Sequence, residues 1–160
     1  METVYLETTF ISYLVALPAR DLVVAAHQQI TRDWWQQRRQ HFRCVVSPVV
    51  IDEVSSGDES EIKKRLEIVG PLDVLAASTD AEELTQAIMD SGVLPEKAVR
   101  DAAHIAVAAV HGVEYLLTWN CRHLANAQIS PRVQVVCKRQ GFRMPVICTP
   151  EELLEEDADE

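Results

Sequence analysis

The chain has 160 residues, 48% of them hydrophobic, and a formal net charge of −10 at pH 7, a composition that suits one domain with a sizeable core. No apolar run approaches the roughly 18 residues of a membrane span, and no basic segment followed by an apolar stretch opens the chain, so we expect a cytoplasmic protein without a membrane partner. The four cysteines contain no C-x-x-C pair, which excludes the simplest metal and redox motifs and favours reduced thiols.

The first half of the chain alternates strand and helix patterns. Residues 4–6 are predicted to form a strand, and apolar residues at helical spacing predict a long helix within 18–42. A short strand at 44–46 precedes a helix with Ser47 as N-cap and Pro48 as its first residue. The pattern continues with a helix at 58–70 and a buried strand at 72–78.

The second half repeats this alternation. We expect a capped helix at 80–92, an alanine-rich helix at 95–112, strands at 113–118 and 133–136, and a last strand with a short capped helix within 145–156. Strands that alternate with helices predict an α/β fold with a parallel sheet covered on both faces. Functional residues of such folds collect at the carboxyl ends of the strands.

The negative charge is concentrated at the end of the chain. Residues 151–160, EELLEEDADE, contain seven acids and no base, so residues 1–150 carry eighteen acids and fifteen bases. The nearly balanced body does not exclude a nucleic-acid partner, although phosphate binding depends on basic side chains. We predict a single domain over residues 1–150 and an acidic tail over 151–160 that begins as a short helix.

Four polar residues stand where such a sheet exposes its site. Glu7 follows the first strand, and Asn120 follows the strand at 113–118; Glu53 lies one turn into an apolar helix, and Asp101 begins the most apolar helix. Carboxylates that converge need a cation, and oxygen ligands suit Mg²⁺ or Mn²⁺. Each residue also has a simpler interpretation: a solvated strand-end acid, a helix N-terminal acid, or a position where Asp52 is the inward carboxylate instead.

Other candidate sites have weaker support. The stretch CRH at 121–123 offers two zinc ligands without the second pair that a structural site needs. His104 and His111, seven residues apart on one helix face, are expected to be packed or surface histidines. Trp34 and Trp35 are expected in the core or at a dimer contact. No G-x-S-x-G stretch and no phosphate-binding G-x-x-x-x-G-K-[ST] loop occurs.

Three stretches carry a resemblance to a known family. VYLETTFISYL at 4–14, SPVVIDEV at 47–54 and RDAAHIAVAAVHGVEYLLTWN at 100–120 resemble the successive acidic motifs of PIN-domain ribonucleases, most of all the VapC-type toxins of toxin-antitoxin pairs. The resemblance runs from residue 3 to about residue 126. It implies a three-layer α/β/α fold with a small central parallel sheet, and a quartet of acidic or amide residues that holds divalent metal for RNA hydrolysis.

The resemblance also implies roles for individual residues. Glu7 takes the first acidic position, where the family usually has Asp, Glu53 the second, and Asp101 the third. Asn120 takes the fourth, where Asp is commoner, and Thr118 matches the hydroxyl that often accompanies it. Together they imply a metal-dependent endoribonuclease that holds Mg²⁺ or Mn²⁺ through Glu7, Glu53, Asp101 and Asn120. As the toxin of a type II pair, it would have an RNA substrate, a cognate antitoxin protein and a second copy in a homodimer as partners.

The two departures from the family pattern keep other functions open. Glu7 is one methylene longer than Asp, and Asn120 lacks a charge. A PIN-like domain that binds RNA or a protein with weak or no catalysis is one alternative. A metal-dependent phosphatase for small molecules is another, and it would need a closed pocket in place of an open groove.

Overall fold

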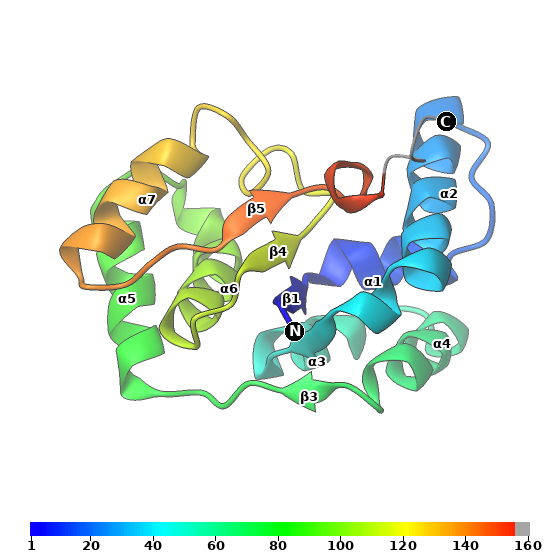
Figure 1. The fold of residues 1–160 in the computed structure, drawn as a ribbon, viewed down its shortest axis with the longest axis horizontal. Coiled ribbons are helices and arrows are strands. Elements are labelled where there is room, and N and C mark those ends of the chain that lie inside the picture. Colours follow the sequence, from blue (N-terminus) through cyan, green and yellow to red (C-terminus); the bar gives the residue numbers. More distant parts are fainter. Residues whose placement is uncertain (156–160) are drawn as a thin grey trace.

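The computed structural model describes residues 1–155, which form a single five-stranded sheet between helices. All strand pairs are parallel, and the order across the sheet is β3-β2-β1-β4-β5 (Figure 1). The strands are β1 (Thr3–Leu6), β2 (Arg43–Val46), β3 (Asp73–Val74), β4 (Tyr115–Leu117) and β5 (Val146–Cys148). Because the chain winds outward from β1 in one direction and then in the other, the order reverses between β1 and β4. Ligand sites of open α/β sheets lie at this switch point.

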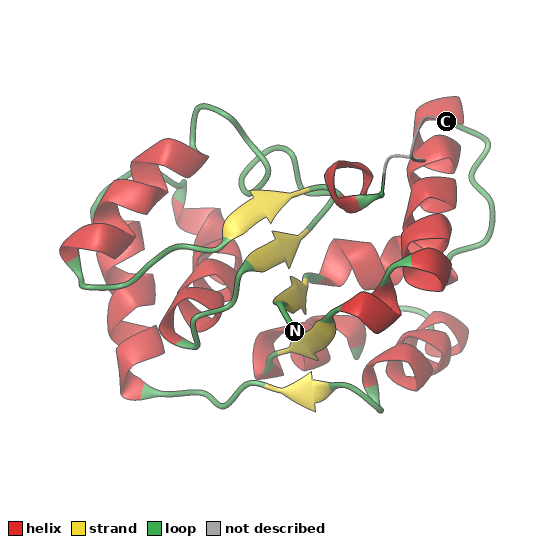
Figure 2. Ribbon diagram, viewed as in Figure 1, coloured by secondary structure: helices red, strands yellow, loops and turns green. Residues whose placement is uncertain are grey.

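Seven α-helices connect the strands. The chain between β1 and β3 carries α1 (Thr8–Val15), α2 (Leu22–Gln37), α3 (Pro48–Val54) and α4 (Glu59–Val69). The chain between β3 and β5 carries α5 (Thr79–Asp90), α6 (Val99–Val110) and α7 (Ser130–Arg139). Right-handed crossovers place these groups on opposite faces of the sheet, and α1, α2 and α4 lie across it from α5, α6 and α7 (Figures 1 and 2). The predicted three-layer α/β/α fold is confirmed.

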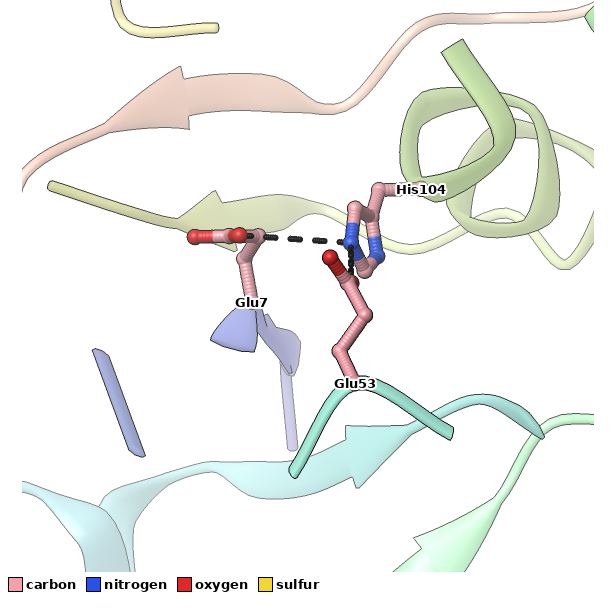
Figure 3. A group of neighbouring side chains, drawn as sticks. All are labelled: Glu7, Glu53 and His104. Atoms are coloured by element: carbon pink, nitrogen blue, oxygen red, sulfur yellow. Dashed lines mark hydrogen bonds and ion pairs between the residues drawn. The ribbon is translucent and has the colours of Figure 1, made fainter. Parts of the chain in front are cut away.

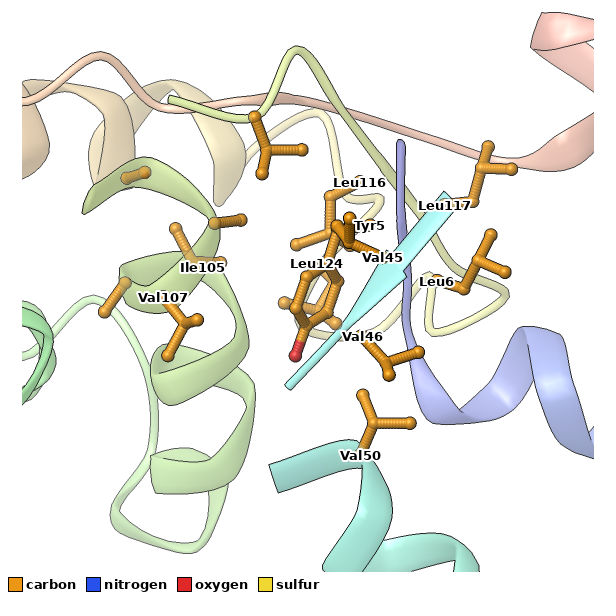
Figure 4. Packing of buried hydrophobic residues seen from close by; sticks show 14 of the residues in the cluster. Tyr5, Leu6, Val45, Val46, Val50, Ile105, Val107, Leu116, Leu117 and Leu124 are labelled. Carbon is orange, nitrogen blue, oxygen red and sulfur yellow. The ribbon is translucent and has the colours of Figure 1, made fainter. Parts of the chain in front are cut away.

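The central strand fills both halves of the core. Tyr5 pairs with Leu116 of β4, and Leu6 pairs with Leu117. Successive strand residues face opposite sides, so Tyr5 and Leu116 point toward α6 while Leu6 and Leu117 point away from it (Figure 4). All four side chains are fully buried. Such burial on both faces anchors the carboxyl end of β1, where Glu7 follows.

Helix α6 is buried beyond its exposed first turn, which explains its alanine content. Its small side chains allow close packing against the sheet and α5, and seven of its residues are buried. A 3-10 turn at Glu96–Ala98 leads into it, and Gly112 ends it with a φ of +67°, a conformation that favours glycine. The enclosed helix holds Asp101 and His104 in fixed positions. Among residues 1–155, no helix combines the length and apolarity that a membrane crossing requires.

Two predicted strands differ from the structure. Residues 133–136 belong to α7, so the predicted strand is wrong. Their valines favour strands locally, but Pro131 lies in the first helical turn, and Val133 and Cys137 form a buried helical stripe. The predicted buried strand at 72–78 is reduced to β3, whose two residues are exposed at the sheet edge. In both places tertiary position outweighs local propensity.

The C-terminal segment follows β5 as a 3-10 helix, Pro150–Leu153, with a capping box between Thr149 and Glu152. It packs beside α2, where Arg38 donates to the Leu153 carbonyl oxygen over 3.4 Å and forms an ion pair of 2.8 Å with Glu155. Residues 156–160 lie outside the described part of the chain. The division into a domain over 1–150 and a tail over 151–160 stays a prediction.

Candidate metal centre

Glu7 lies at the point where β1 becomes α1. Its backbone N–H donates to the Leu117 carbonyl oxygen, and its side chain is the N-cap of α1. The carboxylate is buried, yet Oε2 accepts hydrogen bonds from the Thr9 amide (3.0 Å), the Thr9 hydroxyl and the Thr118 hydroxyl (2.8 Å). These donors replace the water that a buried carboxylate loses. The other oxygen, Oε1, makes no hydrogen bond within residues 1–155.

His104 lies on the face of α6 that meets the sheet, and its side chain is fully buried. Its Nδ1 is 2.6 Å from the Tyr5 hydroxyl, which in turn lies 2.6 Å from the Ser47 hydroxyl. Burial raises the pKa of Tyr5 above its usual range, so the phenol stays protonated and can donate. Ser47 begins α3, but its hydroxyl joins this chain and makes no cap bond to the helix. Tyr5 of β1, backed by Ser47 at the start of α3, therefore fixes the imidazole ring.

Glu53 reaches the same place from α3. Its Oε1 lies 2.5 Å from His104 Nε2 and accepts a hydrogen bond of 2.9 Å from the Thr8 hydroxyl. Burial raises the pKa of Glu53, but bonding to His104, the charge of His104, the Thr8 hydroxyl and the charge of Arg100 outweigh it, and the pKa lies below its usual range. Glu53 is therefore ionised at neutral pH. Asp52, by contrast, points outward into an exposed ion pair of 2.7 Å with Arg100, so Glu53 is the inward carboxylate.

Glu7, Glu53 and His104 form one group of possible metal ligands (Figure 3). Glu7 Oε1 lies 3.9 Å from His104 Nε2, and one donor atom from each residue lies within 4.8 Å of the other two. Two carboxylate oxygens and an imidazole nitrogen at these separations fit a single divalent ion. The sequence predicted the two acids. It predicted His104 only as a packed or surface residue, although its position three residues after Asp101 placed it on the same helix face.

Asp101 and Asn120 meet in a second cluster. Asn120 Nδ2 donates to Asp101 Oδ1 over 3.2 Å, and His123 Nδ1 lies 3.0 Å from Asp101 Oδ2. Asn120 Oδ1 accepts from the backbone amides of Arg122 and His123 and so closes the turn after β4. Asn120 therefore orients Asp101 and shapes the loop. The sequence indicates His123 only as part of the CRH stretch, so its contact with Asp101 is a finding of the structure.

The Thr118 hydroxyl joins the two clusters. It donates to Glu7 Oε2 and accepts from the Asn120 amide over 2.9 Å. Within residues 1–155, no side-chain hydrogen bond or ion pair links Asp101 or Asn120 directly to Glu7 or Glu53. That these four residues hold one ion stays a prediction.

Comparisons with known proteins test the fold. No family model and no curated protein matches the sequence. Among solved structures, VapBC2 from Rickettsia felis, bound to a DNA fragment from its promoter, has a TM-score of 0.60 and 15% identity over 92% of this chain and 98% of the matched chain. VapBC-1 from nontypeable Haemophilus influenzae has a TM-score of 0.58 and 15% identity, over 93% and 98% of the two chains.

A third structure is of a single toxin. VapC20 from Mycobacterium tuberculosis, a sarcin-ricin loop cleaving toxin, has a TM-score of 0.52 and 17% identity over 81% of this chain and 94% of its own. At such identities the likeness concerns the path of the backbone. The match covers 94% to 98% of each matched chain. The chain therefore has the three-layer fold of the VapC toxins, the family that its three acidic motifs resemble.

Proposed function

We propose that the protein is a metal-dependent endoribonuclease and the toxin of a type II toxin-antitoxin pair. The observation that carries this proposal is the convergence of Glu7 and Glu53 beyond the carboxyl end of the central strand. Both carboxylates are held by hydroxyl donors, and Glu53 is ionised at neutral pH. Two converging carboxylates, one buried and one partly exposed, are well suited to a divalent cation. The fold shared with VapC toxins supports the same function.

The proposed ion is Mg²⁺ or Mn²⁺, held by Glu7, Glu53 and Asp101. When bound, it would lower the pKa of a water ligand and neutralise charge on the scissile phosphate. Thr118 holds Glu7 so that Oε1 faces His104 and Glu53. Asn120 fixes Asp101 through its amide group, an orienting role that its occupied carbonyl oxygen supports.

An antitoxin protein and a second copy of the chain are the proposed partners. The similarity to the VapBC complexes supports the antitoxin. Exposed apolar side chains for a homodimer lie in the loop before α2 and in its first turn, where Leu17, Leu22 and Val23 are 73%, 85% and 63% exposed. Trp34 is in the core and supplies none of this surface. Light scattering that shows only an 18.0 kDa particle would contradict the dimer.

RNA cleavage by the purified chain, freed of any partner, tests the proposal. We expect cleavage with Mg²⁺ or Mn²⁺, its loss with EDTA, and a loss of at least about 100-fold in Glu53→Gln. Asp52→Asn is the matched control, because Asp52 is the exposed neighbour on the same helix and should be nearly neutral. Full activity in EDTA, or in Glu53→Gln, would exclude this site as the catalytic one.

A second candidate function is RNA or protein binding with weak or no cleavage. The observation that favours it is Asn120, whose side chain already makes three hydrogen bonds to the loop and to Asp101. A site with one carboxylate fewer attracts a cation less strongly. RNA that is retained but not cut at saturating Mn²⁺ would support this alternative.

A further inference from the structure

His104 offers a metal-ligand geometry that neither the acidic motifs nor the proposed function includes. Its Nε2 faces both carboxylates, 2.5 Å from Glu53 Oε1 and 3.9 Å from Glu7 Oε1. The ring is fully buried, whereas a histidine that served only as packing would present carbon atoms to the core. Glu7 Oε1, the oxygen on the His104 side, lacks a hydrogen-bond donor within the described residues. An oxygen of the buried Glu7 side chain and a nitrogen of the buried His104 ring thus converge beside the Glu53 carboxylate.

The other ring nitrogen is fixed in the way that metal-bound histidines require. Histidine ligands usually donate their second N–H to an oxygen, which sets the tautomer and the ring orientation. Here Nδ1 lies 2.6 Å from the Tyr5 hydroxyl. The Tyr5 hydroxyl can accept from Nδ1–H and donate its own hydrogen bond to the Ser47 hydroxyl, which is 2.6 Å away. In the metal-free protein Nε2 donates to the Glu53 carboxylate over 2.5 Å. A bound ion would displace this proton, and with Nδ1–H donating to Tyr5 the Nε2 lone pair would then face the ion between Glu7 and Glu53. Two buried residues, Tyr5 and Ser47, maintain this orientation.

We propose that His104 is a direct ligand of the divalent ion, and that Glu7, Glu53 and His104 make a mixed nitrogen and oxygen site that prefers Mn²⁺ and Co²⁺ to Mg²⁺. The proposal rests on the proposed function only in that a divalent ion binds here. Imidazole nitrogen suits transition metals, while Mg²⁺ favours oxygen ligands. Affinity for such sites also rises from Mn²⁺ to Co²⁺. The four-residue oxygen set predicted from the sequence should favour Co²⁺ over Mg²⁺ less strongly than a site with an imidazole ligand.

Pulsed electron paramagnetic resonance of the intact chain loaded with Mn²⁺ alone tests ligation directly. We expect the ¹⁴N coupling of a directly bound imidazole in the wild-type protein and its loss in His104→Gln. His111→Gln is the matched control, because His111 is exposed at the end of the same helix and bonds the Ala76 carbonyl oxygen. Coupling that is absent in the wild type, or is lost in His123→Gln and kept in His104→Gln, would overturn the proposal. If His104→Gln does not fold, a coupling that is present in the wild type and kept in both His123→Gln and His111→Gln supports His104, and a coupling lost in His123→Gln overturns it.

Calorimetric titration separates ligation from mere positioning of Glu53. We expect the wild type to bind Co²⁺ at least about 10-fold more tightly than Mg²⁺. In His104→Gln, Co²⁺ affinity should fall about 10- to 100-fold while Mg²⁺ affinity changes less than about threefold. An equal loss for both metals would show that His104 only positions Glu53, and would overturn direct ligation.

The test of His104 ligation and the test of RNA cleavage can fail independently. A ¹⁴N coupling without RNA cleavage would keep the ligand and reject the ribonuclease. Metal-dependent cleavage without the coupling would keep the ribonuclease and reject His104 as a ligand.

Discussion

Two carboxylate-histidine pairs lie on the same side of α6, and they are built differently. The inner pair, Glu53–His104, has a fully buried ring whose second nitrogen bonds Tyr5. The outer pair, Asp101–His123, has a ring that is 14% exposed and whose Nε2 makes no hydrogen bond within residues 1–155. One histidine is locked by the core, and the other is carried by the loop after β4. The rigid inner pair is therefore suited to discriminate between metal ions. The more exposed outer pair can change its geometry when an ion or a substrate binds.

The largest expected effect is the difference between the two histidines in stability. His104→Ala leaves Tyr5 and Glu53 without their partner and opens a cavity in the core, so we expect a loss of about 3 to 4 kcal/mol in the free energy of unfolding. His123→Ala, at a partly exposed position, should cost about 1 kcal/mol. Urea unfolding of both variants in EDTA measures the contrast. Equal losses would mean that the two pairs do not differ in the way described.

Tyr5→Phe should be the next largest change. It removes the hydroxyl between Ser47 and His104, leaves two buried groups unpaired and should lower the free energy of unfolding by about 2 kcal/mol. Tyr13→Phe is the control, since the Tyr13 hydroxyl makes no hydrogen bond within the described residues, and its cost should stay below about 0.5 kcal/mol. Thermal melts without metal give both values. A Tyr5→Phe protein as stable as the control would show that the hydroxyl chain does not hold the inner pair.

Asn120→Asp probes the outer pair. The substitution replaces the amide that donates to Asp101 over 3.2 Å with a second carboxylate, so repulsion should cost about 1 kcal/mol in EDTA and an added ion should recover it. The Mg²⁺ concentration at half-saturation should then fall several-fold, which corresponds to about 1 kcal/mol of more favourable binding free energy. Asn126→Asp, in the same loop but outside both pairs, is the control. An unchanged Mg²⁺ requirement would exclude Asn120 and Asp101 from the metal site.

The smallest expected effect is the acid dependence of the inner pair. Because the folded-state pKa of Glu53 lies below its unfolded value, its contribution to stability is present above the unfolded pKa of about 4.3 and is lost as pH falls through the folded pKa. Glu53→Gln should therefore flatten the decline in melting temperature below about pH 4.5 in EDTA. A decline identical to that of the wild type would mean that the proximity of His104 does not stabilise the Glu53 carboxylate.

Local chemistry in the sequence predicted much of the fold. The strand at 44–46, the Ser47 and Pro48 helix start and the ends at Gly70 and Gly112 depend on neighbouring residues alone, and all appear in the structure. Helix α1 was not predicted, because a short apolar stretch such as FISYL is equally compatible with strand and helix. Its helical form depends on Glu7 acting as N-cap.

The site was partly predictable for the same reason. Glu7 and Glu53 could be named because strand ends and apolar helices are visible in the sequence. His104 could not be recognised, since its partners Tyr5 and Ser47 lie far away in the chain and meet it only in the folded core. The choice between Asp52 and Glu53 likewise needed the orientation of α3 against the sheet.

The pairing of β1 with β4 also determines how late during synthesis the site can assemble. Glu7 is made first, but the Thr118 hydroxyl that holds it lies 111 residues later in the chain. At translation rates of about 5 to 20 residues per second, on the order of 6 to 20 seconds separate the two residues at the ribosome. His104 and Asn120 arrive within the same late interval. A nascent chain that has not reached β4 therefore has the first acidic residue but lacks the Thr118 hydroxyl that holds its carboxylate.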